Sequence, residues 1–245
     1  MPDVEHLFSE EVFVLKARIK FRKYGVMKFI GHLDIMRFFQ KVMRRADIPI
    51  AFTGGFSPHM IMSFANPLGV GVTSEGEYFD IELTEEIDMK AAVERMNQVM
   101  VEGIDVVNMV SISDDKKKTG MSIVAAADYL SSVKTGNFPN GWKEKLNDFM
   151  NQSEILIVKK TKKSEKEVDI KPMIYQLKVV DDDIYMLIAT GSVENLKPEL
   201  VMQAFSVYLN IDVENITFTH HRLDVYANVG TESAKKFVSL DKVTE

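Results

Sequence analysis

The sequence contains no cysteine, and this absence removes several kinds of chemistry at once. Disulfides, thiolate zinc sites and cysteine nucleophiles are excluded, because each of them needs a thiol side chain. The usual thiolate ligands of an iron–sulfur cluster are missing as well. We therefore expect a protein that does not hold such a cluster itself and has no cofactor of its own.

Long apolar runs and the common catalytic motifs are also missing from the 245 residues. No stretch approaches the length of a membrane span, and the acidic start lacks the layout of a signal peptide, so we expect a cytoplasmic protein with no membrane partner. There is no P-loop, no GxGxxG motif opening a helix and no Gly-x-Ser-x-Gly elbow. His220 and His221 are adjacent and would point to opposite faces of a strand, which makes them a poor chelating pair. We expect no metal site.

Charge is unevenly distributed along a chain whose net charge is −6. Residues 11–60 hold ten Lys and Arg against three Asp and Glu, whereas residues 61–120 hold five basic and twelve acidic residues. A sequence pI near 5.5 argues against general coating of nucleic acid, but local patches decide binding. The basic first quarter is therefore a candidate contact surface.

Residues 13–22 alternate between apolar and polar side chains, which predicts a strand with one buried face. The other face would be uniformly positive. Two interpretations are open: an edge strand that is charged to prevent aggregation, or a strand that faces an anion. The cations of this face are Lys16, Arg18, Lys20 and Arg22.

A helix is predicted from near His32 to about Ala46, because apolar residues such as Leu33 and Phe39 recur there at helical spacing. Gly31 and His32 stand at the turn into this helix. A helix N-terminus favours anions, although a glycine turn with a loosely capping histidine would look the same in sequence. The polar side of the helix carries Arg37, Lys41, Arg44 and Arg45.

The segment from Gly54 to Tyr78 contains five glycines, two prolines and three serines between two expected strands. A connection this long inside a compact domain is uncommon and usually functional. His59 can titrate near neutrality or donate to a phosphate, and Glu75 could supply a base or belong to a turn. The candidate catalytic groups are His59, Asp34 and Glu75. Ser57, His59, Ser63 and His32 join the eight cations of the strand and the helix as candidate nucleic-acid contacts.

The expected elements of residues 11–113 follow the order βαββαβ, with the long loop inside, which is the ferredoxin-like arrangement. The charged run 113–120 would be the domain boundary. A second unit with an extra strand would follow over residues 121–228. The basic run 159–167 is expected to be a solvated loop, and residues 229–245 a tail. The expected fold class is α+β, with two tandem ferredoxin-like domains and mostly antiparallel sheets.

Several short segments occur together in a way that is specific in combination. They are F-I-G-H-L-D at 29–34, R-R-A at 44–46, G-F-S-P-H at 55–59, S-F at 63–64, P-L at 67–68 and S-E-G-E-Y at 74–78. In these segments the chain resembles the radical SAM-linked protein family, an uncharacterised bacterial family that carries a domain of unknown function. The family name implies that such proteins are found beside, or fused to, radical S-adenosylmethionine enzymes. The resemblance supplies no catalytic residues.

We therefore expect an accessory protein of a radical SAM enzyme that binds RNA, such as rRNA or tRNA, through the basic face and the glycine-rich segment. Contact would be mainly ionic, because the expected strand face carries Lys and Arg rather than stacking aromatics. Two alternatives remain: an RNA-modifying enzyme in its own right, and a protein-binding adaptor without nucleic acid. The leading hypothesis requires the cations and the segment Gly54 to Tyr78 to meet in one pocket for polyanions.

Overall fold

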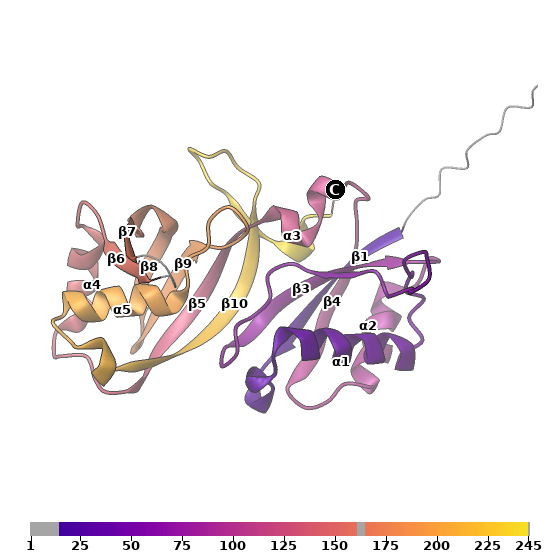
Figure 1. The fold of residues 1–245 in the computed structure, drawn as a ribbon, viewed down its shortest axis with the longest axis horizontal. Coiled ribbons are helices and arrows are strands. Elements are labelled where there is room, and N and C mark those ends of the chain that lie inside the picture. The colour runs from indigo at the N-terminus through magenta and orange to yellow at the C-terminus, as the bar shows by residue number, and fades with distance from the viewer. Residues whose placement is uncertain (1–14, 161–164, 245) are drawn as a thin grey trace, which may run out of the picture.

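The computed structural model describes residues 15–160 and 165–244, and most of its regular structure is strand (Figure 1). Alternation of apolar and polar side chains, as in residues 15–22, builds these strands. They are β1 (Leu15–Lys23), β2 (Met62–Phe64), β3 (Thr73–Leu83), β4 (Ile104–Ile112), β5 (Val124–Thr135), β6 (Leu156–Lys160), β7 (Glu165–Asp169), β8 (Ile174–Val180), β9 (Asp183–Ala189), β10 (Thr217–Asn228) and β11 (Phe237–Ser239).

Nine of these strands form one continuous sheet in the described part of the chain. Their order is β4–β1–β3–β10–β5–β9–β8, with β2 beside β3 and β11 beside β10, while β6 and β7 form a separate hairpin. The pairing of β3 with β10 is parallel, and the other pairs are antiparallel. A mixed α+β fold with a mostly antiparallel sheet is therefore confirmed.

The longer helices pack against this sheet in two groups, one on each half. Helices α1 and α2 bury their apolar faces against β1, β3 and β4, whereas α4 and α5 cover the strands of the second half. The helices are α1 (His32–Arg45), α2 (Met89–Gln98), α3 (Gly120–Ile123), α4 (Trp142–Met150) and α5 (Pro198–Tyr208). Short 3₁₀ turns, among them η1 (Gly25–Phe29) and η5 (Leu240–Lys242), connect or extend the elements.

Each half has its own aromatic core. In the first half the ring centroids of Phe39 lie 4.7 Å from Phe21 and 4.6 Å from Phe79. In the second half the rings of Phe149 and Phe205 lie 5.3 Å apart. The two cores are separate clusters of apolar side chains, so the sheet itself and the residues at its middle join the halves.

The helix predicted from near His32 is α1, but one residue of its buried stripe differs from the expected one. Leu33 is 59% exposed, whereas Ile35 is 4% exposed and faces the sheet. Phe39 is fully buried, as expected. Ile35 aligns with Phe39 at a spacing of four residues and therefore belongs to the buried stripe, whereas Leu33 lies off it.

The expectation that the segment from Gly54 to Tyr78 is a single long loop is wrong. Met62 to Phe64 form β2, which pairs with Ile81 to Phe79 of β3, and β3 itself begins at Thr73. The apolar residues of β2 allow this pairing, which also satisfies the backbone groups of the segment. The glycine-rich tip is therefore confined to residues 53–59, held at its base by the bridge between Phe52 and Met60.

The expectation that residues 229–245 form a tail is wrong for the residues that the structure describes, which extend to residue 244. Strand β11 pairs with β10, and the turn η5 places Leu240 in the core with no exposed surface. The segment lies over the face of β1 and β3 that the helices leave uncovered, because Tyr78 and Asp241 share a hydrogen bond there. It therefore closes the second face of the sheet.

The described residues of the basic run 159–167 belong to a hairpin rather than to a loop. Lys159 and Lys160 end β6 and residues 165–167 begin β7, and the two strands pair there through Lys159 with Lys166 and Lys160 with Glu165. Residues 161–164 of the expected loop lie outside the described residues.

Candidate functional site

The four cations on the polar face of β1 are paired with carboxylates, so this strand presents no free positive face. β1 lies between β3 and β4 in the sheet, which also excludes the edge-strand interpretation. Two of the carboxylates, Asp80 and Glu75, belong to the neighbouring strand β3, while Asp114 follows β4 and Asp224 belongs to β10. The pairs are Lys16–Asp114 at 2.6 Å, Arg18–Asp80 at 2.7 Å, Lys20–Asp224 at 2.8 Å and Arg22–Glu75 at 2.8 Å.

Arg18 is the clearest departure from the expected anion-binding strand, because its side chain is fully buried. Its Nε and Nη2 donate to the two oxygens of Asp80 at 2.7 and 3.0 Å. Nη1 and Nη2 also donate to the carbonyls of Leu240 and Lys118 at 3.0 Å each. Arg18 therefore ties the C-terminal segment to the sheet and cannot reach a ligand in solution.

The cations of α1, in contrast, all face the solvent. Arg37 lies 3.3 Å from Asp34, a pair within the helix that leaves both side chains about two-thirds exposed. Among the described residues, no carboxylate pairs with Lys41, Arg44 or Arg45. We call these three residues the α1 cations. They form the free positive surface that sequence reasoning placed on both the strand and the helix.

The three candidate catalytic groups lie apart. His59 is at the glycine-rich tip, where its Nδ1 and the Thr53 hydroxyl are 3.1 Å apart and the His59 amide donates to the same hydroxyl. Asp34 is on the exposed first turn of α1, and Glu75 pairs with Arg22 at the start of β3. These contacts give each group a local structural role and bring no two of them together.

The serines of the glycine-rich segment do not join the α1 cations in one pocket. Ser57 is exposed on the tip beside His59. Ser63 is in β2, opposite Asp80 of β3. The expectation of a single pocket formed by the cations and this segment is therefore wrong, since β1 is neutralised and the segment is divided by β2.

A different site lies where the two halves meet. A cleft of about 480 Å³ opens between residues 66–72, which lead from β2 into β3, and residues 195–199, which lead into α5. Its floor consists of Tyr129 of β5 with His220 and Arg222 of β10. We call it the junction cleft. Sequence reasoning missed it, because its walls are about 130 residues apart in the chain.

Arg222 anchors the floor of the junction cleft and is only 4% exposed. Its Nη1 donates to both oxygens of Glu77, at 3.0 and 3.1 Å, and to the Asn66 carbonyl at 2.9 Å. Its Nε donates to the Tyr129 hydroxyl at 3.0 Å. Burial opposes the charge of the guanidinium, but Glu77 and Tyr129 outweigh it and raise the pKa of Arg222. The arginine is therefore charged at any physiological pH.

A smaller pocket adjoins the cleft and shares Pro67 and Leu68 with it. It contains His32, the first residue of α1, whose ring packs edge-on against Phe64 at 5.0 Å. Burial lowers the pKa of His32, so the neutral imidazole is favoured. Lys23 and Glu77 also line this pocket, and burial lowers the pKa of Lys23 against the opposing charge of Glu77.

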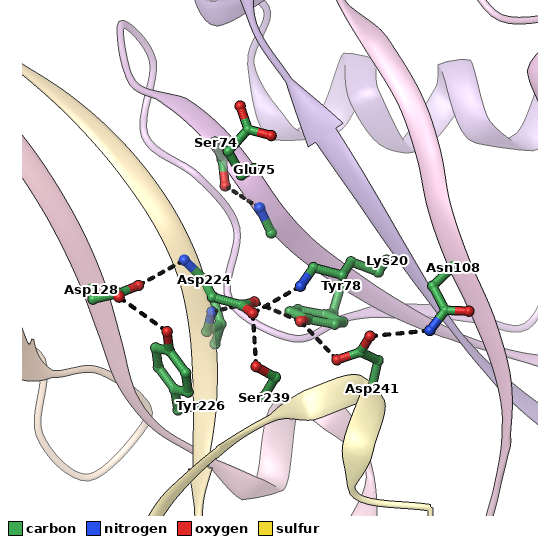
Figure 2. Close-up of polar contacts among 12 residues, drawn as sticks. Lys20, Ser74, Glu75, Tyr78, Asn108, Asp128, Asp224, Tyr226, Ser239 and Asp241 are labelled. Atoms are coloured by element: carbon green, nitrogen blue, oxygen red, sulfur yellow. Dashed lines mark hydrogen bonds and ion pairs between the residues drawn. The ribbon is translucent and has the colours of Figure 1, made fainter.

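Beneath the junction, on the other face of the sheet, a polar network joins the halves (Figure 2). Asp224 of β10 accepts hydrogen bonds from Lys20 at 2.8 Å and from the Tyr78 hydroxyl at 2.6 Å. Ser239 of β11 donates to it as well, at 2.8 Å. Burial, together with the charge of Asp224, raises the pKa of Tyr78, which keeps the phenol protonated as the donor. The network holds β1, β3, β10 and β11 in register.

The network continues into the second half through Asp128 of β5. Its carboxylate accepts from the Asp224 amide at 2.8 Å and from the hydroxyls of Tyr226 and Tyr185 at 3.0 and 3.1 Å. Burial raises the pKa of Asp128 while these three donors oppose the rise. Because Asp128 has donors on both oxygens, this carboxylate is a structural acceptor that fixes β5 to β10.

The family of the chain follows from its sequence. A model for a family described as an uncharacterized protein conserved in bacteria, DUF2344, matches residues 16–198. The chain belongs to DUF2344. No curated protein matches the chain in sequence.

Solved structures similar to this DUF2344 chain are distant. A chain of a Cbf5–Nop10–Gar1 complex aligns with a TM-score of 0.46 and 10% identity, over 85% of this chain and 48% of that one. A chain of an H/ACA RNP bound to a substrate RNA containing 2′-deoxyuridine aligns with a TM-score of 0.43 and 11% identity, over 84% and 46%. This chain therefore spans about half the length of those chains, and similarity at this level carries no functional argument.

Two further properties of the DUF2344 chain concern metals and membranes. Within residues 15–160 and 165–244, no group of three His, Asp or Glu side chains is arranged to hold a metal ion. No helix in the same ranges combines the length and the apolar character needed to cross a bilayer.

Several signature segments of the DUF2344 chain meet at the junction. Gly31 and His32, Phe64, and Pro67 with Leu68 surround the smaller pocket or turn into it, and Glu77 reaches Arg222. The segment G-F-S-P-H instead forms the exposed tip at the other end of the first half. Pro67 and Leu68 of the P-L segment line the cleft, whereas nothing local in the sequence distinguishes Arg222.

Proposed function

We propose that this chain binds RNA through a surface that runs from the α1 cations to the junction cleft, as an accessory of a radical SAM enzyme. The observation that supports RNA binding is the set of α1 cations, Lys41, Arg44 and Arg45, exposed and without carboxylate partners among the described residues. Unpaired Lys and Arg side chains at the surface are the groups that neutralise the phosphates of a nucleic acid. In a chain of net charge −6, most other N-terminal cations are paired.

The link to a radical SAM enzyme rests on the signature segments and on the lack of cysteine. A chain without thiolates cannot hold an iron–sulfur cluster by cysteine ligation, so the cluster would belong to the partner. The role that remains for this chain is to bind and present the substrate. RNA presented in this way fits an RNA-modifying partner.

The fold proposal keeps two tandem ferredoxin-like units. In the first unit the strands lie in the order β4–β1–β3–β2, and in the second in the order β10–β5–β9–β8. Counted within each unit, both orders read 4-1-3-2, which suits a βαββαβ chain. The hairpin β6–β7 would then be an insertion in the second unit. Units of this kind present helices and loops on one side for binding, although fold alone does not give function.

The RNA proposal is tested with a variant that reverses the α1 cations. We expect Lys41→Glu/Arg44→Glu/Arg45→Glu to lower the affinity for single-stranded RNA by about tenfold or more at moderate salt, because about three phosphate contacts are lost. The slope of log K against log salt should fall by about 2, at ~0.7 per phosphate contact. Fluorescence anisotropy with a labelled RNA over a salt series measures both quantities.

The matched control reverses three exposed lysines of the second half, Lys134→Glu/Lys166→Glu/Lys236→Glu, which changes the net charge equally. This control should retain most of the affinity and the slope of the wild type. Equal losses in both variants would mean that only the overall charge matters. Affinity that does not depend on salt would overturn ionic RNA binding altogether.

The adaptor alternative has one observation in its favour. Val26, Phe29, Leu33 and Val70 are apolar side chains between 59% and 74% exposed, near the start of α1 and the rim of the cleft. Such a patch is typical of a protein contact. Purification of the native protein in a stable complex with another protein, free of nucleic acid, would favour the adaptor over the RNA-binding accessory.

A further inference from the structure

We infer that the junction cleft holds one nucleotide of the bound RNA, with the base on the floor beside Arg222 and a phosphate at Lys197. This inference rests on the proposed RNA-binding function and adds to it the position and the chemistry of a single-nucleotide site. The argument has three parts: the space and walls of the cleft, the free donor of Arg222, and the charge at the mouth.

The cleft has the size and the walls that a planar ring requires. Its volume of about 480 Å³ lies in the range of small-molecule sites, which are mostly apolar with a few directed polar groups. One wall offers Pro67, Val70 and Val72, which keep exposed surface, whereas Leu196 and Pro198 of the other wall are buried. An inorganic anion would gain nothing from such a wall, whereas a nucleobase would bury one of its faces against it.

Arg222 supplies a directed polar group. Its Nε and Nη1 are engaged by Tyr129, Asn66 and Glu77, but its Nη2 has no hydrogen-bond partner among the described residues. Arg222 is a lining residue of the cleft and is 4% exposed, and among the described residues Thr190 Oγ1, not Arg222 Nη2, is the buried side-chain atom without a partner. The free Nη2 therefore keeps a small exposed surface in the cleft, where an acceptor of the ligand can replace water as its partner. The carbonyl oxygens of uracil, cytosine and guanine are such acceptors.

The charges at the mouth place the phosphate. Lys197 is exposed, immediately precedes α5, and pairs with no carboxylate of the described residues. The N-terminus of α5 adds a partial positive charge at the same point. Glu199 is in the first turn of α5 with its side chain 43% exposed, and its carboxylate is bound to His220 Nε2 at 2.8 Å, which lowers the pKa of Glu199. A phosphate would therefore avoid this carboxylate and lie at Lys197.

His220 is not available to the ligand. Its Nδ1 and the hydroxyl of Ser131 are 2.8 Å apart, and its Nε2 is held by Glu199. Both ring nitrogens are thus engaged by the protein. The selectivity of the cleft should then come from Arg222, and a base that carries a carbonyl oxygen should bind better than adenine, which has none.

The test titrates the full-length chain with the 5′-monophosphates of uridine, cytidine, guanosine and adenosine, with uridine, and with inorganic phosphate, by isothermal calorimetry. We expect the three carbonyl-bearing nucleotides to bind better than adenosine monophosphate and inorganic phosphate. Lys197→Glu, at an exposed position, should weaken the binding of uridine monophosphate at least fivefold and leave the binding of uridine nearly unchanged. Lys134→Glu is the matched control and should bind as the wild type does.

Arg222→Lys is the second variant. It should weaken the binding of both uridine and uridine monophosphate, because a lysine at this position cannot bind the partners of the arginine and also offer a free donor to the ligand. Circular dichroism checks that it folds, and Lys197→Glu remains informative if it does not. Inorganic phosphate that binds as tightly as the nucleotides would overturn the nucleotide site. So would RNA binding that needs the α1 cations while no nucleotide binds; in that case the proposed function stands and the cleft is not part of it.

Discussion

Two buried arginines show how the meaning of a residue depends on its distant partners. Arg18 lies in a strand whose sequence suggests an outward positive charge and Arg222 in a strand without such a pattern, yet each is almost fully buried. Their acidic partners, Asp80 and Glu77, are 62 and 145 residues away in the chain. A buried arginine without such a partner would strongly destabilise the fold, so the carboxylates are part of the reason these arginines are tolerated.

The local pattern predicted where cations would lie along β1, but the neutralising charges could not be predicted in the same way. The alternation of residues 15–22 follows from the sequence and the structure has it. The partners of Lys20 and Arg18 depend on which strands become neighbours and in which register. Within α1 the same reasoning placed the cations correctly at exposed positions, because these follow from the period of the helix itself, although it put Leu33 on the buried side.

His32 provides a prediction of pH dependence. Because burial lowers its pKa below the ordinary value of 6.5, the folded chain binds fewer protons at this site than the unfolded chain. Its contribution to stability is therefore present above pH 6.5 and is lost as the pH falls through the lower, folded-state pKa. The wild type should lose more unfolding free energy between pH 7.5 and 5.5 than His32→Gln does, as measured by urea denaturation.

The comparison with His32→Gln is needed because other buried groups titrate in the opposite sense. Burial raises the pKa of Glu77 and of Asp128, and each of these favours the folded state at low pH. These contributions are common to both proteins and cancel in the difference. Identical pH profiles for the two proteins would show that His32 is not held neutral by the fold.

At the scale of elements, the sequence predicted those helices and strands that are long enough to show a helical or alternating pattern of apolar residues by themselves. Strand β1 and helix α1 lie close to where the sequence places them. Two of the elements that were missed, β2 and β11, have three residues each. A strand this short has too few residues for its alternation to be recognised, and it exists because a neighbouring strand offers a free edge.

Leu240 tests whether the C-terminal segment belongs to the folded structure. Its side chain is fully buried, and the Arg18 guanidinium donates to its carbonyl at 3.0 Å. Leu240→Ala should lower the unfolding free energy by about 2–5 kcal/mol, the usual cost of removing a buried leucine side chain. Chemical denaturation measures the change, with Val193→Ala, at a side chain 95% exposed, as the control.

A tail of the kind expected from sequence would give a different result. Leu240→Ala would then cost no more than the control substitution at Val193. The size of the loss therefore separates a segment that completes the second face of the sheet from one that merely follows it. A loss of unfolding free energy that exceeds the control but stays below about 1 kcal/mol would indicate that the cavity left by the leucine side chain collapses or that the segment detaches readily.

At the scale of the whole molecule, the proposed site depends on how the two halves are joined. The direct strand contact between them is short: His221 pairs with Thr73 and Arg222 pairs with Ser74. The polar network around Asp224 reinforces this contact from one face (Figure 2). The junction cleft opens on the other face. Neither half alone contains the cleft, so a reading of one half at a time could not have found it.

Gly76 is where the junction tolerates no extra atom. A Cβ at this position would lie 3.0 Å from the Cα of Asp224 and would overlap its carboxylate, which Lys20 and Tyr78 hold in place. The glycine of the S-E-G-E-Y segment is thus explained by the close approach of β3 to β10. The sequence marked the residue, but the reason lies in a strand about 150 residues away.

Gly76→Ala should therefore wedge β3 away from β10 and lower the unfolding free energy by about 1–3 kcal/mol, as overpacking of a filled site does. The matched control is Gly54→Ala, since nothing lies within 4 Å of a Cβ at Gly54. Because the wedge acts beside Arg222, the same variant should also weaken nucleotide binding while Gly54→Ala leaves it unchanged. Urea denaturation and calorimetry with uridine monophosphate measure the two effects. If Gly76→Ala were as stable as Gly54→Ala, the close contact between the halves would not exist in solution, and the cleft that depends on it would have no fixed floor.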